Sequence, residues 1–170
     1  FALDLASRGA QMLHKNFDGR AGSMDADGHA LYEAACARSD GIAAHYEARD
    51  FSQVMVAVRE LAESANRYFD AQTPWTLVKQ DPEAARRVLT SLLNSFRVLA
   101  IYLKPILPSY ATQVEQLFGE EPYRWAAIGH PYENQTLNPY TYLATRVDPK
   151  QVAAMVERSR QAAPAPSAPA

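Results

Sequence analysis

The sequence predicts an all-α domain, and three observations lead to that prediction. Glycine is scarce, with 7 residues among 170, and the long periodic stretches contain almost none. Runs of β-branched residues with the alternation of strands are missing, whereas apolar residues recur at the three- and four-residue spacing of helices. With 48% hydrophobic residues, a chain of this length can bury the core of one domain.

The first half of the chain predicts three helices. The opening residues, about 1–16, are in helical phase, and an irregular stretch rich in Gly and Asp follows from Asp18 to Gly28. A second helix is expected from about His29 to Ala48, and a third, the clearest, from Asp50 to about Gln72. The apolar stripe of this third helix comprises Phe51, Val54, Met55, Val58, Leu61, Ala62, Ala65, Tyr68 and Phe69.

A further long helix begins where Asp81 supplies an N-cap and Pro82 occupies the first helical position. Pro105 ends it, and Pro108 and Gly119 bracket a shorter amphipathic helix. The apolar stripe of the long helix comprises Ala85, Val88, Leu89, Leu92, Leu93, Phe96, Leu99, Ala100 and Leu103. We therefore expect five helices in sequence up to this point.

The C-terminal part of the chain is expected to be less regular. Residues 119–147 carry several aromatic side chains without a sustained period, which predicts an ordered loop packed on the bundle. Within it, Trp125 is interpreted as a packing residue together with Tyr123 and Tyr132.

Asp148 and Pro149 repeat the combination of cap and proline, so a short helix is expected to about Gln161. The last nine residues are only Ala, Pro and Ser, which is typical of a linker or tail. The predicted domain is thus a helical bundle over 1–161 with a tail over 162–170.

The composition excludes several classes of function. A net charge of −2 provides no general electrostatic attraction for nucleic acid, so any RNA binding must be local. No stretch has the roughly 18 uncharged apolar residues of a membrane span, and the single cysteine, Cys36, fits a reducing compartment. We expect a cytoplasmic protein.

Catalytic and metal-binding motifs are not evident in the sequence. It has no Gly-rich phosphate loop, no Glu-x-x-His pair and no Gly-x-Ser-x-Gly turn. His29 and Glu33 lie four residues apart, but one such pair is more typical of a salt bridge than of a metal site. We therefore expect no catalytic residue, no metal and no cofactor in this chain.

The most informative segment is the junction after the third helix. Thr73 can cap the next turn, Pro74 fits its first position and Trp75 follows directly. From its type alone, a tryptophan between helices is more often a packing residue. A tryptophan held by a preceding proline and surrounded by hydrogen-bond donors nevertheless offers a rigid stacking face for single-stranded bases.

This segment resembles a known family. The stretch from Ala65 to Trp75 (ANRYFDAQTPW), Lys79, and the stretch from Asn94 to Pro108 (NSFRVLAIYLKPILP) are similar to the C-terminal anticodon-binding helical domain of bacterial methionyl-tRNA synthetases, class I enzymes. Residues 5–8 and 15–19 match the first helix of that domain and the turn after it. Only the tail lies outside the resemblance.

The resemblance implies an anticodon site. In the family, the tryptophan after the proline stacks on an anticodon base, which gives this role to Trp75 and makes Pro74 the residue that sets its pose. Arg8 occupies the position of a donor to base edges or phosphate. The family's asparagine is replaced by Asp4, which as a carboxylate only accepts hydrogen bonds and, four residues from Arg8, can pair with it.

Four further residues have supporting roles in this interpretation. Asn66 and Asp70 share one side of their helix and are expected to support the Trp75 junction or to touch the RNA. Arg67 adds a donor nearby. Lys79, like Lys104, is expected to be either a phosphate contact or a solvated surface residue.

The implied function is recognition of the CAU anticodon of methionine tRNA by the non-catalytic domain of a methionine-tRNA ligase. The catalytic signatures HIGH and KMSKS are absent from the sequence, so the resemblance assigns ATP with Mg, and leaves open a Zn ion, to the catalytic region of a longer enzyme. It also implies an upstream catalytic domain as partner, and in some relatives a downstream tRNA-binding or dimerising module.

Two alternatives remain open from the sequence. A helical interaction or scaffold domain with a decayed RNA site is compatible with the acidic balance of the chain and with Asp4. The anticodon domain of another class I synthetase would share the helical bundle and differ in the anticodon that it prefers.

Overall fold

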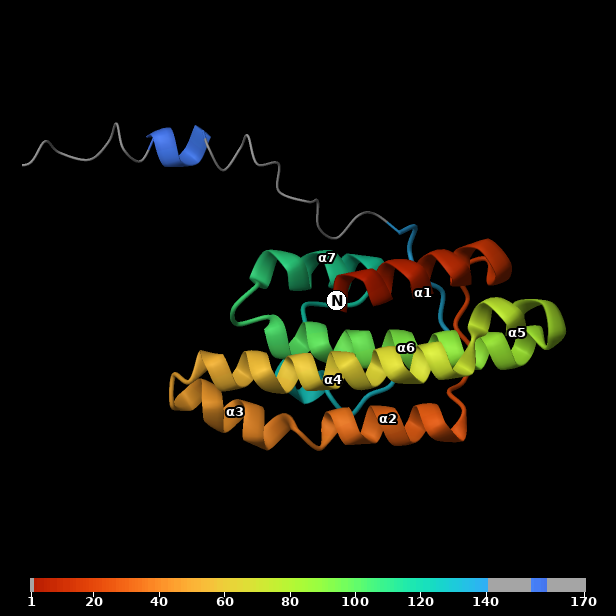
Figure 1. Cartoon of the computed structure of the whole chain (residues 1–170), viewed down its shortest axis with the longest axis horizontal. Coiled ribbons are helices and arrows are strands. Elements are labelled where there is room, and N and C mark those ends of the chain that lie inside the picture. Colours follow the sequence, from red (N-terminus) through yellow and green to blue (C-terminus); the bar gives the residue numbers. More distant parts are fainter. Residues whose placement is uncertain (1, 141–153, 159–170) are drawn as a thin grey trace, which may run out of the picture.

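The computed structural model describes residues 2–140 and 154–158, with side chains from Ser7 onward (Figure 1). Within these residues there is no named strand, only an isolated bridge between Arg20 and Thr136, and the prediction of an all-α fold is confirmed. The helices are α1 (Ala2–Phe17), α2 (Ala26–Cys36), α3 (Ser39–Glu47), α4 (Phe51–Gln72), α5 (Pro74–Gln80), α6 (Pro82–Leu103), α7 (Pro108–Phe118) and the short 3₁₀ helix η1 (Trp125–Ala127).

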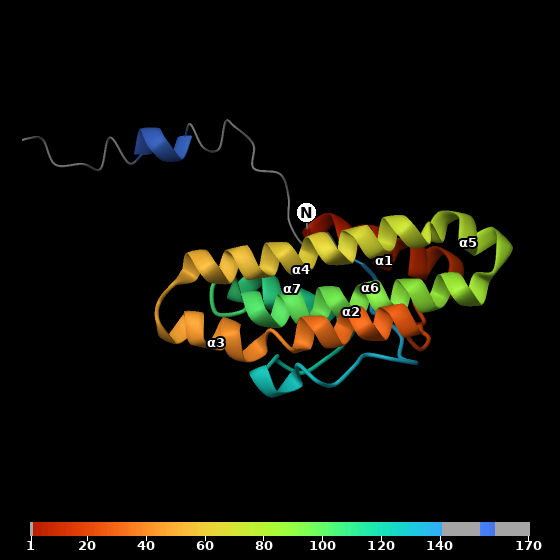
Figure 2. The same ribbon diagram turned by 60° about the horizontal axis from the view of Figure 1, so that its bottom comes forward.

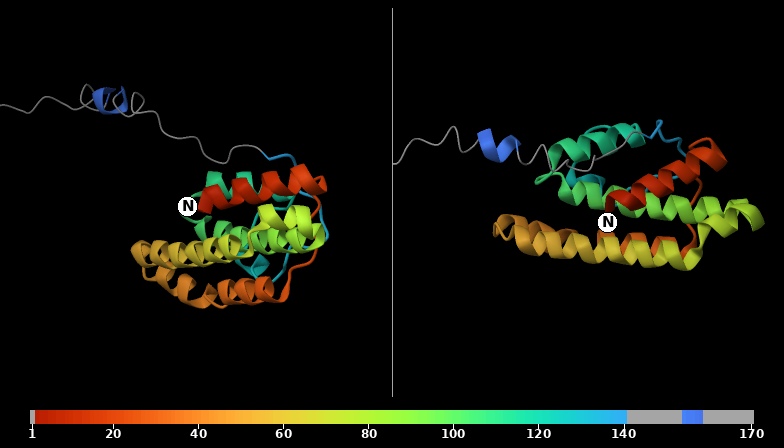
Figure 3. Two further views of the ribbon diagram at one scale, coloured as in Figure 1. Left: turned by 45° about the vertical axis from the view of Figure 1, so that its right-hand side comes forward. Right: turned by 45° about the horizontal axis from the view of Figure 1, so that its top comes forward.

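Helix α6 is the centre of the bundle. It packs against α1, α2, α4, α5, α7 and η1. Helices α1 and α7 lie on one side of it and the α2–α3 pair on the other (Figures 1 and 3). Helix α5 lies at the end of the bundle opposite the α3–α4 turn (Figure 2). None of the helices in the described part of the chain has the length and apolar character needed to cross a membrane.

The predicted apolar stripe of α6 understates its burial, because every residue from Val88 to Leu103 is buried. A helix buried all round normally has few polar residues. Most of the buried polar residues of α6 find partners in the irregular segment before α2 or in the loop after α7, and the Thr90 hydroxyl accepts from the backbone N–H of Gly22 at 2.9 Å. The Ser95 hydroxyl instead donates to the carbonyl of Ser91 within α6 at 3.1 Å. The buried polar residues of α6 are Thr90, Ser91, Asn94, Ser95 and Arg97.

One oxygen of Asp25 joins three helices. It accepts hydrogen bonds from the N–H of Gly28 at 2.8 Å, the hydroxyl of Tyr68 at 2.8 Å and the hydroxyl of Ser91 at 3.2 Å. Burial raises the pKa of Tyr68, so its hydroxyl remains a donor at neutral pH. We call these four residues the Asp25 junction, which ties the N-terminus of α2 to α4 and α6.

The predicted helix ends are confirmed where local caps mark them. Asp50 accepts from the N–H of Gln53 at 3.2 Å, and Asp81 accepts from the N–H of Ala84 at 3.0 Å with Pro82 at the first position of α6. Helix α7 runs from Pro108 to a left-handed Gly119 (φ 66°).

The single helix predicted from His29 to Ala48 is wrong, because the chain forms α2 and α3 with a break after Cys36, and α2 begins three residues earlier. The break has a tertiary cause. The Tyr102 hydroxyl on α6 donates to the carbonyl of Ala35 at 2.7 Å, and the N–H of Arg38 donates to the same carbonyl at 3.3 Å in a tighter turn than that of an α-helix. Arg38, just after the break, pairs with Glu60 on α4 at 3.0 Å.

The loop after α7 packs on the bundle as predicted, as far as Tyr140. Tyr132 is fully buried, and its backbone N–H and C=O both bond to the buried side chain of Asn94, at 2.6 and 2.8 Å. Each such bond contributes about 1 kcal/mol net, and more is lost when its partner is left unpaired. Trp125 is a packing residue as expected, but its ring contacts are with Tyr46 and Tyr102, whereas Tyr132 meets Phe118 and Tyr123 meets Arg97.

The C-terminal predictions are only partly within the described residues. Residues 154–158 are helical, inside the short helix predicted to end near Gln161. The rest of that helix, the domain limit at 161 and the tail over 162–170 lie outside the described residues.

Candidate nucleic-acid interface

The junction between α4 and α5 depends on the backbone of Thr73. This residue has φ 43° and ψ 57°, the left-handed conformation, and it ends α4 and starts α5. Its carbonyl accepts from the N–H groups of Thr76 and Leu77 at 2.9 and 3.2 Å. The expectation that the Thr73 side chain caps the next turn is wrong, because that side chain makes no cap hydrogen bond.

A left-handed conformation is unfavourable for a β-branched residue, at a cost of about 1–3 kcal/mol. Replacing Thr73 with glycine removes that strain but adds flexibility to the unfolded chain worth about 0.5–1 kcal/mol. We therefore expect Thr73→Gly to raise the free energy of unfolding by about 1 kcal/mol, measured by urea denaturation. A loss of stability instead would show that side-chain packing of Thr73 outweighs the strain.

Trp75 follows this turn and is open to solvent. Pro74 is buried at the first position of α5, where its fixed φ angle suits a helix start. The backbone of Trp75, the next residue, is therefore held at the beginning of α5. Trp75 is 46% exposed, and its ring meets that of Phe69 edge-on, with the two ring centres 5.9 Å apart and the planes at 72°. A large aromatic ring is thus held by the protein while much of its surface remains in water.

Arg8 of α1 contacts the same Phe69 ring as Trp75 does. Its guanidinium carbon is 4.9 Å from the centre of the Phe69 ring, within the range of a cation–π contact, and the residue is exposed. The structure therefore brings Arg8 and Trp75, which are 67 positions apart in the sequence, to one buried ring. The side chain of Asp4 lies outside the described residues, so its pairing with Arg8 stays a prediction.

The supporting residues divide between two sides of α4. Asn66, one turn before Phe69, is half-buried, and its side-chain nitrogen is buried without a hydrogen-bond partner among the described residues. Asp70, four residues after Asn66, is exposed. Arg67 does not join them, because it donates to the Ser64 hydroxyl at 2.9 Å and lines a shallow groove with Arg38.

The two lysines differ. Lys79 is exposed in the last turn of α5, four residues after Trp75 and so on the same side of that helix. Lys104 does not fit the prediction of a phosphate contact or a solvated surface residue, because its ammonium donates to Glu115 at 2.7 Å and to the carbonyl of Tyr123 at 2.9 Å.

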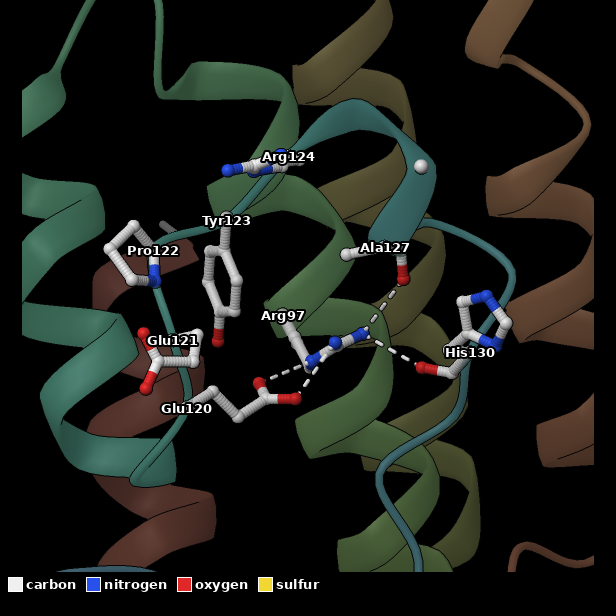
Figure 4. A pocket seen from close by; sticks show the side chains of 9 residues that line it. Arg97, Glu120, Glu121, Pro122, Tyr123, Arg124, Ala127 and His130 are labelled. Atoms are coloured by element: carbon white, nitrogen blue, oxygen red, sulfur yellow. Dashed lines mark hydrogen bonds and ion pairs between the residues drawn. The ribbon is translucent and has the colours of Figure 1, made fainter.

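A separate pocket lies between α6 and the loop after α7 (Figure 4). The cation at its centre is Arg97, and it is already paired within the protein. The Arg97 guanidinium, 4% exposed, donates two hydrogen bonds to Glu120 at 2.6 and 2.9 Å. It also donates to the carbonyls of Ala127 and His130, at 3.3 and 2.9 Å. This arrangement fastens the loop to α6 and engages the Arg97 guanidinium within the protein.

No metal site is evident in the described part of the chain, where no three His, Cys, Asp or Glu side chains gather as a ligand set. Sequence reasoning missed the role of Phe69, which it counted only as one member of the apolar stripe of α4. The available signal was its place one turn before Thr73, at the point where the chain leaves the helix.

Comparison with known families gives a match over most of the chain. Residues 19–157 match the family described as the anticodon binding domain of methionyl tRNA ligase. The match covers α2 to α7 and includes the turn that carries Trp75.

Curated relatives agree with that match. The methionine–tRNA ligase of Bdellovibrio bacteriovorus is 47% identical over 158 residues, which cover 93% of this chain and 23% of the relative. The methionine–tRNA ligase of Thiobacillus denitrificans is 39% identical over 165 residues, covering 94% and 23%. The chain thus spans about a quarter of the length of these relatives.

Solved structures show the same fold. The free form of Mycobacterium tuberculosis methionyl-tRNA synthetase superposes with a TM-score of 0.78 at 28% identity, over 86% of this chain and 32% of that one. The complex of the same synthetase with methionyl-adenylate gives a TM-score of 0.77 at 27% identity, over 84% and 30%.

Proposed function

Because this chain belongs to the family of methionyl-tRNA ligase anticodon-binding domains, we propose that it binds the anticodon loop of methionine tRNA and reads its CAU bases. The observation that carries the proposal is Trp75, which is 46% exposed yet held against a buried ring. Unpaired bases stack on aromatic rings of this kind, and proteins read single-stranded loops in this way.

The neighbouring side chains have complementary roles in this proposal. Arg8 donates to a base edge or a phosphate near the stacked base, and Lys79 contacts a phosphate on the Trp75 side of α5. Asp4 accepts from an exocyclic amine or pairs with Arg8. Asn66 and Asp70, in the last two turns of α4, support the Trp75 junction or touch the RNA, whereas Arg67, which bonds along α4, acts at most on the outer backbone of the RNA.

The larger protein to which such a domain belongs would use it to select its tRNA. We propose that this protein is a cytoplasmic methionine-tRNA ligase, which activates methionine with ATP and Mg; a Zn ion, if the enzyme holds one, belongs to its catalytic region. In that arrangement the bundle contributes to specificity by choosing the tRNA whose acceptor end reaches the upstream catalytic domain. Any downstream module after the tail would add to tRNA affinity or join two copies.

The proposal is tested by titrating the chain with a fluorescent anticodon stem-loop at low salt. Replacing Trp75 with alanine is expected to weaken binding by about 1–3 kcal/mol, or about 5- to 150-fold, because one stacking face is lost. The matched control is Trp125→Phe, which changes the other tryptophan, packed against Tyr46 and Tyr102 rather than Phe69.

Changing the CAU bases of the stem-loop is expected to weaken binding to the unaltered chain. Equal affinity for every loop sequence would contradict the proposal and favour a helical scaffold instead. Preference for a different anticodon would indicate recognition of another tRNA.

A further inference from the structure

Phe69 is the side chain on which the two proposed RNA contacts meet. It lies on α4, is 1% exposed, and contacts Trp75 of α5 and Arg8 of α1. We propose that Phe69 is a positioning residue, an inference that rests on the proposed RNA binding. It holds the side chains of Arg8 and Trp75 in place relative to each other, so that both can contact one short single-stranded RNA segment. It acts through these two side chains and does not touch the RNA itself.

The geometry limits how far apart the two contacts can be. The Arg8 guanidinium carbon is 4.9 Å from the Phe69 ring centre, and the Trp75 ring centre is 5.9 Å from it. The distance between the Arg8 guanidinium carbon and the Trp75 ring centre therefore cannot exceed the sum of these two distances. That limit is about the length of three stacked bases at about 3.4 Å each, so one trinucleotide can reach both side chains.

The contact between Arg8 and Phe69 affects RNA affinity because an unrestrained arginine side chain has many rotamers. Arg8 is exposed on a helix, and an unrestrained side chain must lose this freedom when RNA binds. The aromatic face of Phe69 attracts the guanidinium before binding, so less freedom is lost on binding. An aliphatic residue fills the same space but has no π face for either neighbour.

The turn before α5 is a separate support. Trp75 follows a left-handed Thr73 and a buried Pro74, which fix the backbone from which the indole projects, whereas the ring also depends on the side chains that it touches. The edge-on contact with Phe69 is the ring contact that Trp75 makes among the described residues. Removal of the Phe69 ring therefore frees the indole and the guanidinium together, while the turn itself remains.

The test uses Phe69→Leu and, as a second variant, Phe69→Met, both of which keep an apolar side chain in the core. The chain has two tryptophans, so Trp125→Phe as background leaves Trp75 as the single indole reporter. Loss of the ring is expected to lower the fluorescence anisotropy of Trp75 and to increase its quenching by acrylamide. Binding of the CAU stem-loop should weaken about 5- to 10-fold, as two side chains lose their preorganisation.

A double-mutant cycle with Arg8→Met separates positioning from simple destabilisation. We expect Arg8→Met to weaken binding about 5-fold when Phe69 is present and less than about 2-fold in the Phe69→Leu chain, because coupled residues are not additive. The matched control is Phe96→Leu, since Phe96 is equally buried at 1% exposure but packs against Tyr110 and Phe118. This control should lose stability while Trp75 anisotropy and RNA affinity stay unchanged.

The outcomes distinguish the two proposals. If the unaltered chain does not bind the stem-loop, the proposed function fails, and the anisotropy of Trp75 still tests whether Phe69 holds the indole. If the chain binds RNA but Phe69→Leu and Arg8→Met are additive, or Trp75 anisotropy is unchanged, the positioning role of Phe69 is overturned.

Discussion

Replacing Gly28 with alanine is expected to destabilise the bundle by about 3–5 kcal/mol, because overpacking and the loss of several hydrogen bonds to a carboxylate act together. A Cβ at this position would overlap the side chain of Ser91 and crowd the Asp25 carboxylate. Both belong to the Asp25 junction, so the added methyl group cannot be accommodated by one flexible side chain alone. Helix α2 would have to move away from α6, and the bond from Tyr68 would be strained with it.

Gly41→Ala is the matched control. Gly41 lies in α3, and apart from the backbone of its own helix no atom lies within 4 Å of the place that a Cβ would take. Alanine should therefore stabilise the chain by about 0.5–1 kcal/mol through helix propensity. Urea denaturation followed by circular dichroism measures both variants. A loss below about 1 kcal/mol for Gly28→Ala would show that the α2–α6 contact is loosely packed.

Replacing Arg97 with methionine is expected to cost about 3–5 kcal/mol of unfolding free energy, the typical loss when one member of a buried ion pair is removed. The change leaves Glu120 without its partner and the carbonyls of Ala127 and His130 without a donor (Figure 4). Because these groups all lie in the loop after α7, the loop should detach first. Trp125 in that loop reports the detachment as a change in its fluorescence.

Two further variants make this result specific. Arg38→Met breaks an ion pair with Glu60 whose side chains are both about half exposed, and it should cost only about 0–1 kcal/mol. Adding Glu120→Leu to Arg97→Met removes the uncompensated carboxylate and should restore part of the loss. Equal losses for Arg97→Met and Arg38→Met would contradict the structural role of the buried pair.

The candidate site shows how far sequence reasoning reaches. The sequence places Trp75 after a proline at a helix junction, and the indole is exposed there. The prediction for Thr73 failed, since a threonine before a helix usually caps through its side chain, whereas here the left-handed backbone makes the turn. The meeting of Arg8 and Trp75 on Phe69 depends on how three helices pack, and no local pattern contains that information.

The sequence by itself determined the helices that depend on local interactions. The caps at Asp50 and Asp81, the prolines that open α6 and α7, and the apolar period of α4 act within a few residues, so they can be recognised along the chain. Only the tertiary structure decided the break after Cys36 and the burial of the polar side of α6. Those features depend on hydrogen bonds between distant residues, such as Tyr102 with Ala35 and Asn94 with Tyr132, whose partners are chosen by packing.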